Sequence, residues 1–200
     1  IGAGSGGLSV AAGASPMGAS TVLIERAKMG GDCLNYGCVP SKALIAAAQA
    51  AHAVRRAPEF GVNAGALDVD FNRVHDHVHD VIAAIAPHDS VERFEGFGVT
   101  VILGHARFTG PREVEADGKR IRARRFVIAT GSSPAAPPIP GLDGVPYFTN
   151  ETIFDNCDAP DHLIIIGGGP IGVELAQAHC RLGVKVTVLE MFGVLGRDDP

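Results

Sequence analysis

Short apolar runs recur along the chain, each bounded by glycine, proline or charged residues. Runs of four to six residues that are rich in β-branched side chains are typical of buried strands. They lie at residues 21–24, 99–103, 124–129, 163–166 and 184–189. Residues 111–122 alternate between polar and apolar positions around Asp117-Gly118, which predicts a β-hairpin.

Two longer segments show the periodicity of helices. Residues 40–56 are rich in alanine and begin with proline, a residue that suits the first turn of a helix. Residues 71–85 place five aliphatic side chains on one helical face: Val74, Val78, Val81, Ile82 and Ile85. Residues 133–146 contain five prolines and predict a turn-rich connector, so we expect a domain boundary between this connector and Leu163.

Composition narrows the classes of protein. The chain has 200 residues, 17 Lys and Arg against 22 Asp and Glu, and a net charge of −5. This balance does not favour nucleic acid as a partner, and no apolar run approaches the roughly 20 residues of a membrane span. The 26 glycines are clustered rather than periodic, which excludes collagen and favours glycine-rich binding turns. We expect a cytoplasmic protein.

The glycines form two copies of one motif. Gly2, Gly4 and Gly7 have the spacing G-x-G-x-x-G, and a second set with the same spacing comprises Gly167, Gly169 and Gly172. An acid, Glu25 or Glu190, lies 23 residues after the first glycine of each copy and closes a predicted strand. Such a turn brings pyrophosphate to a helix N-terminus while the acid accepts from a ribose hydroxyl. The pair therefore favours dinucleotide binding over two purely structural turns.

These copies predict an α/β fold with two Rossmann-like dinucleotide-binding domains. We assign residues 1–150 to the first of these domains and residues 151–200 to the beginning of the second. Only Ile1 precedes the first glycine turn, where a whole strand is normally found. We therefore interpret the chain as a fragment of a longer protein, with the first domain incomplete and the second truncated.

Two of the four cysteines have a chemically informative setting. Cys33 and Cys38 lie in the segment GGDCLNYGCVPSK, residues 30–42, with C-x4-C spacing. A ring of this size can close as a redox disulfide, whereas the spacing does not match zinc motifs. Cys38 lies at the N-terminus of the predicted helix, whose dipole stabilises a thiolate, so Cys33 is the exchanging thiol. The alternative is a pair of inert core cysteines. Of the other two, Cys157 has no such setting, and we expect Cys180 to pack in the core.

The same segment resembles the flavin-dependent pyridine nucleotide–disulfide oxidoreductases, and within them dihydrolipoamide dehydrogenase and mercuric reductase. The resemblance covers essentially the whole chain. It implies that the first glycine turn and Glu25 hold the ADP half of FAD and that the second turn and Glu190 hold NAD(P). It also assigns further residues to FAD: Gly31, Asp32, His105, Ala106, Thr130, Gly131 and Ser132. Lys42 is expected to pair with Glu174 and to contribute, with the two cysteines, to catalysis beside both cofactors.

Some implications of the resemblance concern specificity. The family usually has threonine where Asp32 stands, and an acid is unfavourable beside a pyrophosphate. Glu190 favours NAD(H) over NADP(H) because a carboxylate repels a 2′-phosphate, although Arg197 lies nearby. This preference favours a dihydrolipoamide dehydrogenase-like enzyme acting on a disulfide or dithiol substrate. An NADPH-dependent mercuric reductase acting on Hg(II) is the alternative.

The resemblance also implies what lies outside this chain. A homodimer is expected, with a His–Glu pair from the second subunit as proton donor and acceptor, so the fragment alone should be inactive. A flavin-only reductase or oxidase and a non-catalytic redox sensor remain competing functions. His75 and His79 are four residues apart on the predicted helix. We interpret them as part of a solvated polar face rather than as metal ligands.

Overall fold

The computed structural model describes residues 1–196, so Arg197 lies outside the described residues. The chain divides into two compact units. The first comprises residues 1–39 and 82–151, and the second comprises residues 40–81 and the chain from residue 152 onward. The assignment of residues 1–150 and 151–200 to two nucleotide-binding domains stays a prediction.

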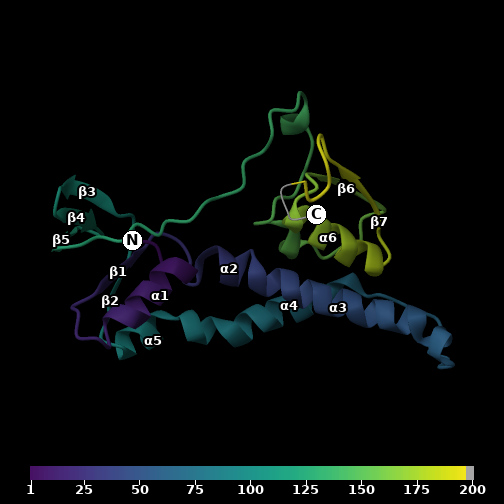
Figure 1. Cartoon of the computed structure of the whole chain (residues 1–200), viewed down its shortest axis with the longest axis horizontal. Coiled ribbons are helices and arrows are strands. Elements are labelled where there is room, and N and C mark those ends of the chain that lie inside the picture. Colours follow the sequence, from purple (N-terminus) through teal and green to yellow (C-terminus); the bar gives the residue numbers. More distant parts are fainter. Residues whose placement is uncertain (197–200) are drawn as a thin grey trace. The chain divides into compact units, whose positions relative to one another are not determined.

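The first unit contains a helix followed by a pair of parallel strands (Figure 1). Helix α1 (Ser5–Ala14) follows the first glycine turn and leads to β1 (Val22–Glu25), which pairs in parallel with β2 (Thr100–Leu103). Helix α5 (Val91–Gly96) precedes β2. One hydrophobic cluster joins these elements and comprises Ala3, Leu8, Ala11, Leu23, Phe94 and Val99. The strands predicted at residues 21–24 and 99–103 are confirmed.

Three antiparallel strands form a separate small sheet in this unit. They are β3 (Arg107–Gly110), β4 (Glu113–Ala116) and β5 (Lys119–Arg122). Asp117 and Gly118 join β4 to β5 with φ angles of 51° and 68°. Two consecutive positive φ values are what a tight hairpin turn requires, so the predicted hairpin is confirmed.

The strand predicted at residues 124–129 is wrong. This segment does not form a regular strand, and two of its backbone groups bond to Ile1. The Ile1 nitrogen donates to the Val127 carbonyl, and the Ala129 nitrogen donates to the Ile1 carbonyl, both at 2.8 Å. The backbone is therefore extended, but two bonds to a single residue do not make a ladder. The connector that follows contains a short 3₁₀ turn, η3 (Leu142–Gly144).

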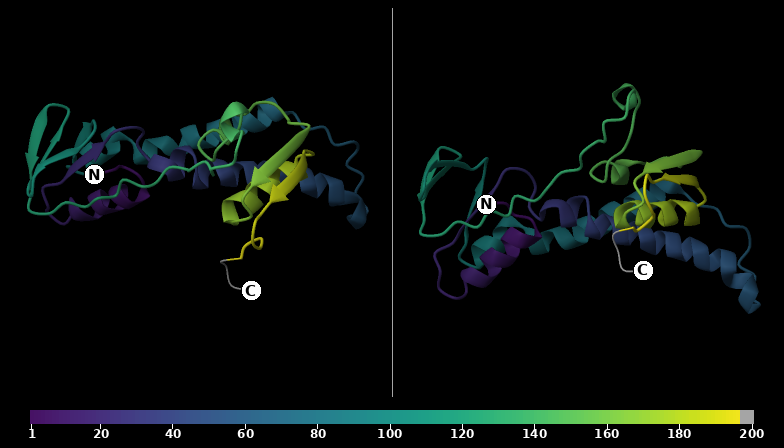
Figure 2. Two further views of the ribbon diagram at one scale, coloured as in Figure 1. Left: turned by 90° about the horizontal axis from the view of Figure 1, so that it is seen from above. Right: turned by 45° about the horizontal axis from the view of Figure 1, so that its top comes forward.

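Four helices, α2 to α5, and two 3₁₀ turns lie between β1 and β2 in the sequence. Helix α2 (Gly31–Asn35) contains Cys33, and α3 (Cys38–Arg56) begins at Cys38 and leads into η1 (Ala57–Phe60). Helix α4 (Phe71–Ile85) has the predicted bounds, and η2 (Ala86–Asp89) leads from it to α5. Figure 2 shows α3 and α4 as the longest helices. Both predicted helices are confirmed, whereas the sequence pattern did not indicate α2.

The second unit contains a complete parallel strand–helix–strand arrangement. It contains η4 (Ile153–Asp155), β6 (His162–Ile166), α6 (Pro170–Arg181) and β7 (Lys185–Leu189). Strands β6 and β7 pair in parallel, from His162 opposite Lys185 to Ile166 opposite Leu189, and α6 connects them (Figure 1). Both strand predictions here are confirmed. Within residues 1–196, every helix is too short or too polar to cross a membrane.

Candidate functional site

The first glycine turn has the geometry that its sequence predicts. Gly2 has a φ of 98°, a conformation that favours glycine, and its nitrogen donates to the Ile24 carbonyl at 2.8 Å. A Cβ atom on Gly7 would lie 1.7 Å from the Gly2 carbonyl oxygen. Helix α1 therefore packs directly on the turn, and only glycine fits at position 7.

Glu25 ties the end of β1 to this turn. Its carboxylate accepts from the Ala3 nitrogen at 2.6 Å and from the Ala27 nitrogen at 2.7 Å. The residue is buried, with 8% of its surface exposed. Two backbone donors satisfy a buried carboxylate and fix its position, so Glu25 is held at the carboxyl end of its strand.

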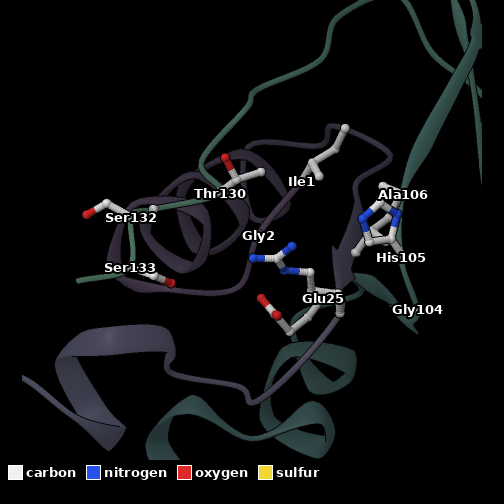
Figure 3. Close-up of a pocket in the computed structure, with 12 residues that line it drawn as sticks. Ile1, Gly2, Glu25, Gly104, His105, Ala106, Thr130, Ser132 and Ser133 are labelled. Carbon is white, nitrogen blue, oxygen red and sulfur yellow. The ribbon is translucent and has the colours of Figure 1, made fainter. Parts of the chain in front are cut away.

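A cavity of about 380 Å³ opens beside Glu25 (Figure 3). Three segments that the sequence assigned separately to FAD line it together: the first glycine turn with Glu25, residues 104–106, and residues 130–132. Gly2, His105, Ala106, Thr130, Gly131 and Ser132 are among the lining residues. The cavity lies at the carboxyl ends of parallel strands β1 and β2, the usual place for ligands in such sheets. Its volume falls within the range of small-molecule sites.

The structure adds lining residues that the motif reasoning missed. They are Ile1, Ile24, Arg26 and Ser133. Each directly adjoins a residue that the motifs had identified, so adjacency was the signal that could have found them. Arg26 places the only guanidinium among the residues that line this cavity. Gly4, Gly7, Gly31 and Asp32 do not line it.

The cysteine segment is attached to the same glycine turn. The Gly30 nitrogen donates to the Ala3 carbonyl at 2.9 Å, and Gly30 forms a parallel bridge with Gly4. A Cβ atom on Gly31 would lie 2.5 Å from the Gly4 Cα atom. The backbones approach so closely that a side chain does not fit there. The start of α2 is therefore held against the turn that begins α1.

Cys33 and Cys38 interact as two thiols rather than as a disulfide in the structure. Cys33 is half-buried in α2, and Cys38 is exposed at the first position of α3. Burial and the neighbouring Cys38 together raise the pKa of the Cys33 thiol to about 11. Burial therefore favours the protonated form of Cys33, and the division of roles between the two cysteines stays a prediction.

The second glycine turn has the same geometry as the first. Gly167 has a φ of 114°, and a Cβ atom on Gly172 would lie 2.1 Å from the Gly167 carbonyl oxygen. Glu190 accepts from the Gly168 nitrogen at 2.7 Å and from the Phe192 nitrogen at 3.0 Å. Gly169 is the N-cap of α6. The two turns are therefore structural equivalents.

Lys42 and Glu174 form an ion pair within the second unit. The Lys42 ammonium donates to both carboxylate oxygens of Glu174, at 2.6 and 2.8 Å. The two residues are 132 positions apart in sequence, and their side chains are 60% and 40% exposed. Lys42 lies four residues after Cys38 in α3. The structure thus shows the pairing that the resemblance implied.

The remaining candidates have more ordinary surroundings. The His75 and His79 rings are 4.2 Å apart and half-buried, and His79 Nε2 bonds to the Phe154 carbonyl at 3.1 Å. They therefore lie partly against η4 rather than on a fully solvated face. Within residues 1–196, histidine, cysteine and acidic side chains form no cluster of three suited to a metal ion. The expectation that Cys180 packs in the core is wrong, because α6 buries Ala178 and His179 and leaves Cys180 exposed.

Comparison with known proteins finds relatives among mercuric reductases and dihydrolipoyl dehydrogenases. The mercuric reductase of Bacillus cereus is 37% identical over 190 residues, which cover 95% of this chain and 30% of that protein. The mercuric reductase of Streptomyces lividans is 37% identical over 206 residues, covering 100% of this chain and 44% of the relative. The dihydrolipoyl dehydrogenase of Thermus scotoductus is 36% identical over 197 residues, covering 95% and 41%.

A solved structure shares the fold. The HOCl-induced flavoprotein disulfide reductase RclA from Escherichia coli has a TM-score of 0.84 and 30% sequence identity, covering 100% of this chain and 43% of that chain. This chain therefore spans less than half the length of these proteins. The profile of the pyridine nucleotide-disulphide oxidoreductases, flavoproteins that use FAD and NAD(P)H, matches residues 1–198. The expected α/β fold is confirmed, and the chain belongs to the pyridine nucleotide-disulphide oxidoreductase family.

Proposed function

We propose that this chain carries the FAD-binding part, and the beginning of the NAD(P)-binding part, of an FAD-dependent oxidoreductase. The protein couples a nicotinamide nucleotide to a substrate through the redox disulfide Cys33–Cys38. When bound, FAD supplies the two-electron chemistry that links the two. We further propose a homodimer in the cytoplasm, with a proton donor and acceptor from the second subunit.

The observation that carries this proposal is the junction of cavity and cysteine segment. The cavity brings three nucleotide-binding segments together, and the Gly30 backbone ties the cysteine segment to the same glycine turn. The residues present fit the ADP half of FAD, because glycines keep the turn open to the backbone and Glu25 is held where a ribose hydroxyl is expected. Thr130, Gly131 and Ser132 add polar groups to the lining of the cavity.

The two cysteines divide the work of exchange. Reduction of the disulfide takes up two electrons and one proton, which leaves a Cys33 thiol and a Cys38 thiolate. After a base removes the Cys33 proton, the Cys33 thiolate attacks a substrate disulfide and releases one substrate thiolate. The Cys38 thiolate then attacks the Cys33 sulfur, which restores the Cys33–Cys38 bond and releases the second substrate thiolate. A dithiol substrate reacts by the same steps in reverse.

Lys42 and Glu174 contribute a charged pair to the proposed reaction. The Glu174 carboxylate holds the Lys42 ammonium through two hydrogen bonds, so that its positive charge has a fixed position. A fixed positive charge stabilises negative charge that develops during electron transfer. In the second turn, Gly167, Gly169 and Gly172 receive the pyrophosphate of NAD(H), and Glu190 selects against a 2′-phosphate.

We propose a lipoamide-like disulfide or dithiol as the substrate class. Because the relatives named above include two mercuric reductases, Hg(II) is the second candidate. Steady-state assays of the holoenzyme with lipoamide and NAD(H), and with Hg(II) and NADPH, separate the two. A lower KM for NADPH than for NADH would contradict the role given to Glu190.

Anaerobic titration of the holoenzyme with NADH tests the central step. We expect a long-wavelength thiolate-to-flavin charge-transfer band after two electrons, and its loss in Cys38→Ser. Cys180→Ser is the matched control, because Cys180 is an exposed thiol outside the proposed pair, and it should keep the band. Simple bleaching of the flavin without the band in the unmodified protein would instead support a flavin-only reductase.

A further inference from the structure

Asp32 immediately precedes the first cysteine of the redox pair, and the structure shows where its carboxylate points. A Cβ atom on Gly37 would lie 2.6 Å from Asp32 Oδ2 and 3.1 Å from the Asp32 carbonyl oxygen. The carboxylate therefore lies against Gly37, inside the segment that joins Cys33 to Cys38. The carboxylate therefore points toward the segment between the two cysteines and does not line the cavity.

The position of Gly37 places this negative charge at a helix end. Gly37 directly precedes Cys38, the first residue of the 19-residue helix α3. The first turn of α3 contains no acidic residue of its own. The N-terminal end of a long helix stabilises a nearby negative charge. Asp32 therefore places a carboxylate against Gly37, the residue that directly precedes this helix end.

Asn150 holds the carboxylate in this orientation. Its Nδ2 atom donates to Asp32 Oδ1 at 3.4 Å, from a position 118 residues away in the sequence but within the same unit. One carboxylate oxygen thus faces Asn150 while the other faces Gly37. The tether is an exposed hydrogen bond, so it directs the carboxylate without removing it from solvent.

We propose that Asp32 is a positioning residue that disfavours the thiolate in the Cys33–Cys38 pair and so makes the disulfide harder to reduce. The inference rests on the proposed function, because it assumes that the two cysteines form the redox disulfide. The effect on Cys33 has the direction that this proposal requires. Burial and Cys38 raise the pKa of the Cys33 thiol most, and the charge of Asp32 raises it further. Asp32 and Cys38 are the titrating groups that act on it.

The test compares the charge-removing variant Asp32→Asn with the unmodified holoenzyme. Each protein is equilibrated anaerobically with mixtures of reduced and oxidised dithiothreitol, and the Cys33–Cys38 disulfide is counted by alkylation and mass spectrometry. Asp32→Asn should shift the equilibrium toward the reduced pair by about three- to tenfold, where tenfold corresponds to about 30 mV. The rate of iodoacetamide alkylation of the reduced pair should rise at a lower pH in this variant.

Three further variants separate charge from structure. Asp32→Glu keeps the charge and should behave like the unmodified protein, and Asp143→Asn removes another exposed acid of the same unit and should change neither readout. Asn150→Ala releases the carboxylate and should give part of the Asp32→Asn shift. Because the carboxylate is exposed, the difference should shrink near 1 M salt, where the screening length falls to about 3 Å.

Each outcome decides between distinct conclusions. If Cys33 and Cys38 form no disulfide in any protein, the proposed function fails. If they do, but Asp32→Asn matches Asp143→Asn in both equilibrium and alkylation profile, only the role of Asp32 is overturned. A shift of equal size in Asp32→Glu would likewise overturn it, because packing rather than charge would then be responsible. If Asp32→Asn does not fold, Asn150→Ala decides, and an unchanged equilibrium in it contradicts the proposal.

Discussion

The two glycine motifs have the same backbone hydrogen bonds at a constant offset of 165 residues, but the residues around them differ. The Gly2 nitrogen bonds to Ile24 and the Gly167 nitrogen to Leu189 in the same way. The hydrogen bond from Gly30 to Ala3 recurs as one from Leu195 to Gly168, at 2.9 and 2.8 Å. The repetition therefore extends well beyond the six residues of the motif itself.

The differences lie in what each copy is attached to. Glu25 is buried and its turn is bridged to the cysteine segment, whereas Glu190 is exposed. At the position equivalent to Gly30, the second copy has Leu195 with a φ of 54°. The same turn thus forms a packed junction with the cysteine segment in one copy and a more open edge in the other. Stability should depend more on the first copy than on the second.

The third glycine of each motif should give the largest effect. Gly7→Ala and Gly172→Ala place a methyl group against a backbone carbonyl, at 1.7 and 2.1 Å before relaxation. Because backbone cannot yield cheaply, each should cost about 3 kcal/mol or more of unfolding free energy, with Gly7→Ala the more severe. Urea denaturation measures this. Gly13→Ala is the control, because its Cβ would have open space in the same α1 helix and should stabilise by about 0.5–1 kcal/mol.

The two acids should separate the copies more clearly. Glu25→Gln replaces a buried carboxylate that accepts two backbone hydrogen bonds. The NH2 group of the glutamine would then face one of these backbone N–H groups, and neither can accept a hydrogen bond. We expect a loss of about 1–3 kcal/mol. Glu190→Gln is exposed and should cost less than about 1 kcal/mol while it weakens discrimination against NADPH. Equal losses of stability in the two variants would contradict the proposed asymmetry.

Much of this fold could be predicted from periodicity and spacing. Helix α4 occupies the predicted residues because its apolar face repeats for four turns. The helix and strand that follow each glycine turn agree with the glycine spacing. The strand expected at residues 124–129 failed because a ladder depends on a neighbouring strand, which the segment's own composition does not reveal. Helix α2 was missed because five residues carry too short a pattern.

The candidate site divides in the same way. The resemblance identified the segments that line the cavity and the Lys42–Glu174 pair, because their sequence spacing is specific. It did not predict where Asp32 points, since that depends on Gly37 and on Asn150, a residue 118 positions away. Side-chain orientation of this kind follows from tertiary contacts rather than from local pattern.

Low pH should destabilise the protein through a histidine in α6 that has no counterpart in α1. His179 is buried in α6, and burial lowers its pKa below the ordinary value of 6.5, whereas α1 has Ala14 at the equivalent position. As the pH falls below 6.5, the unfolded chain binds a proton that folded His179 resists, so stability falls by up to about 1.4 kcal/mol per pH unit. His179→Gln should reduce this slope in urea denaturation between pH 7 and 5.5, and exposed His77→Gln should not. An unchanged slope in His179→Gln would contradict the assignment.

Leu195 offers a test of strain in the second copy. A leucine in the left-handed region costs about 1–2 kcal/mol relative to an unstrained backbone, and glycine relieves this at some entropic cost. Leu195→Gly should therefore stabilise the protein by up to about 1 kcal/mol in thermal or urea denaturation. Gly30→Ala makes the reverse change in the first copy and should destabilise it, because its Cβ would also meet Leu34 at 2.3 Å. Destabilisation by Leu195→Gly would show that its side chain contributes more than the strain costs.

The Lys42–Glu174 pair should have the smallest effect on stability and a larger one on activity. Both side chains are substantially exposed, so solvent screens their attraction and the coupling in a double-mutant cycle should be about 0.2–1 kcal/mol. Lys42→Met and Glu174→Gln, alone and together, provide the cycle by urea denaturation at low and high salt. Arg56 and Glu59, an exposed pair on α3 and η1, give a matched reference of similar coupling and no effect on turnover.

Because the proposed role of Lys42 is to place a charge rather than to stabilise the fold, Lys42→Met should lower kcat at least tenfold while stability barely changes. A coupling near 3 kcal/mol with unchanged kcat would identify the pair as structural.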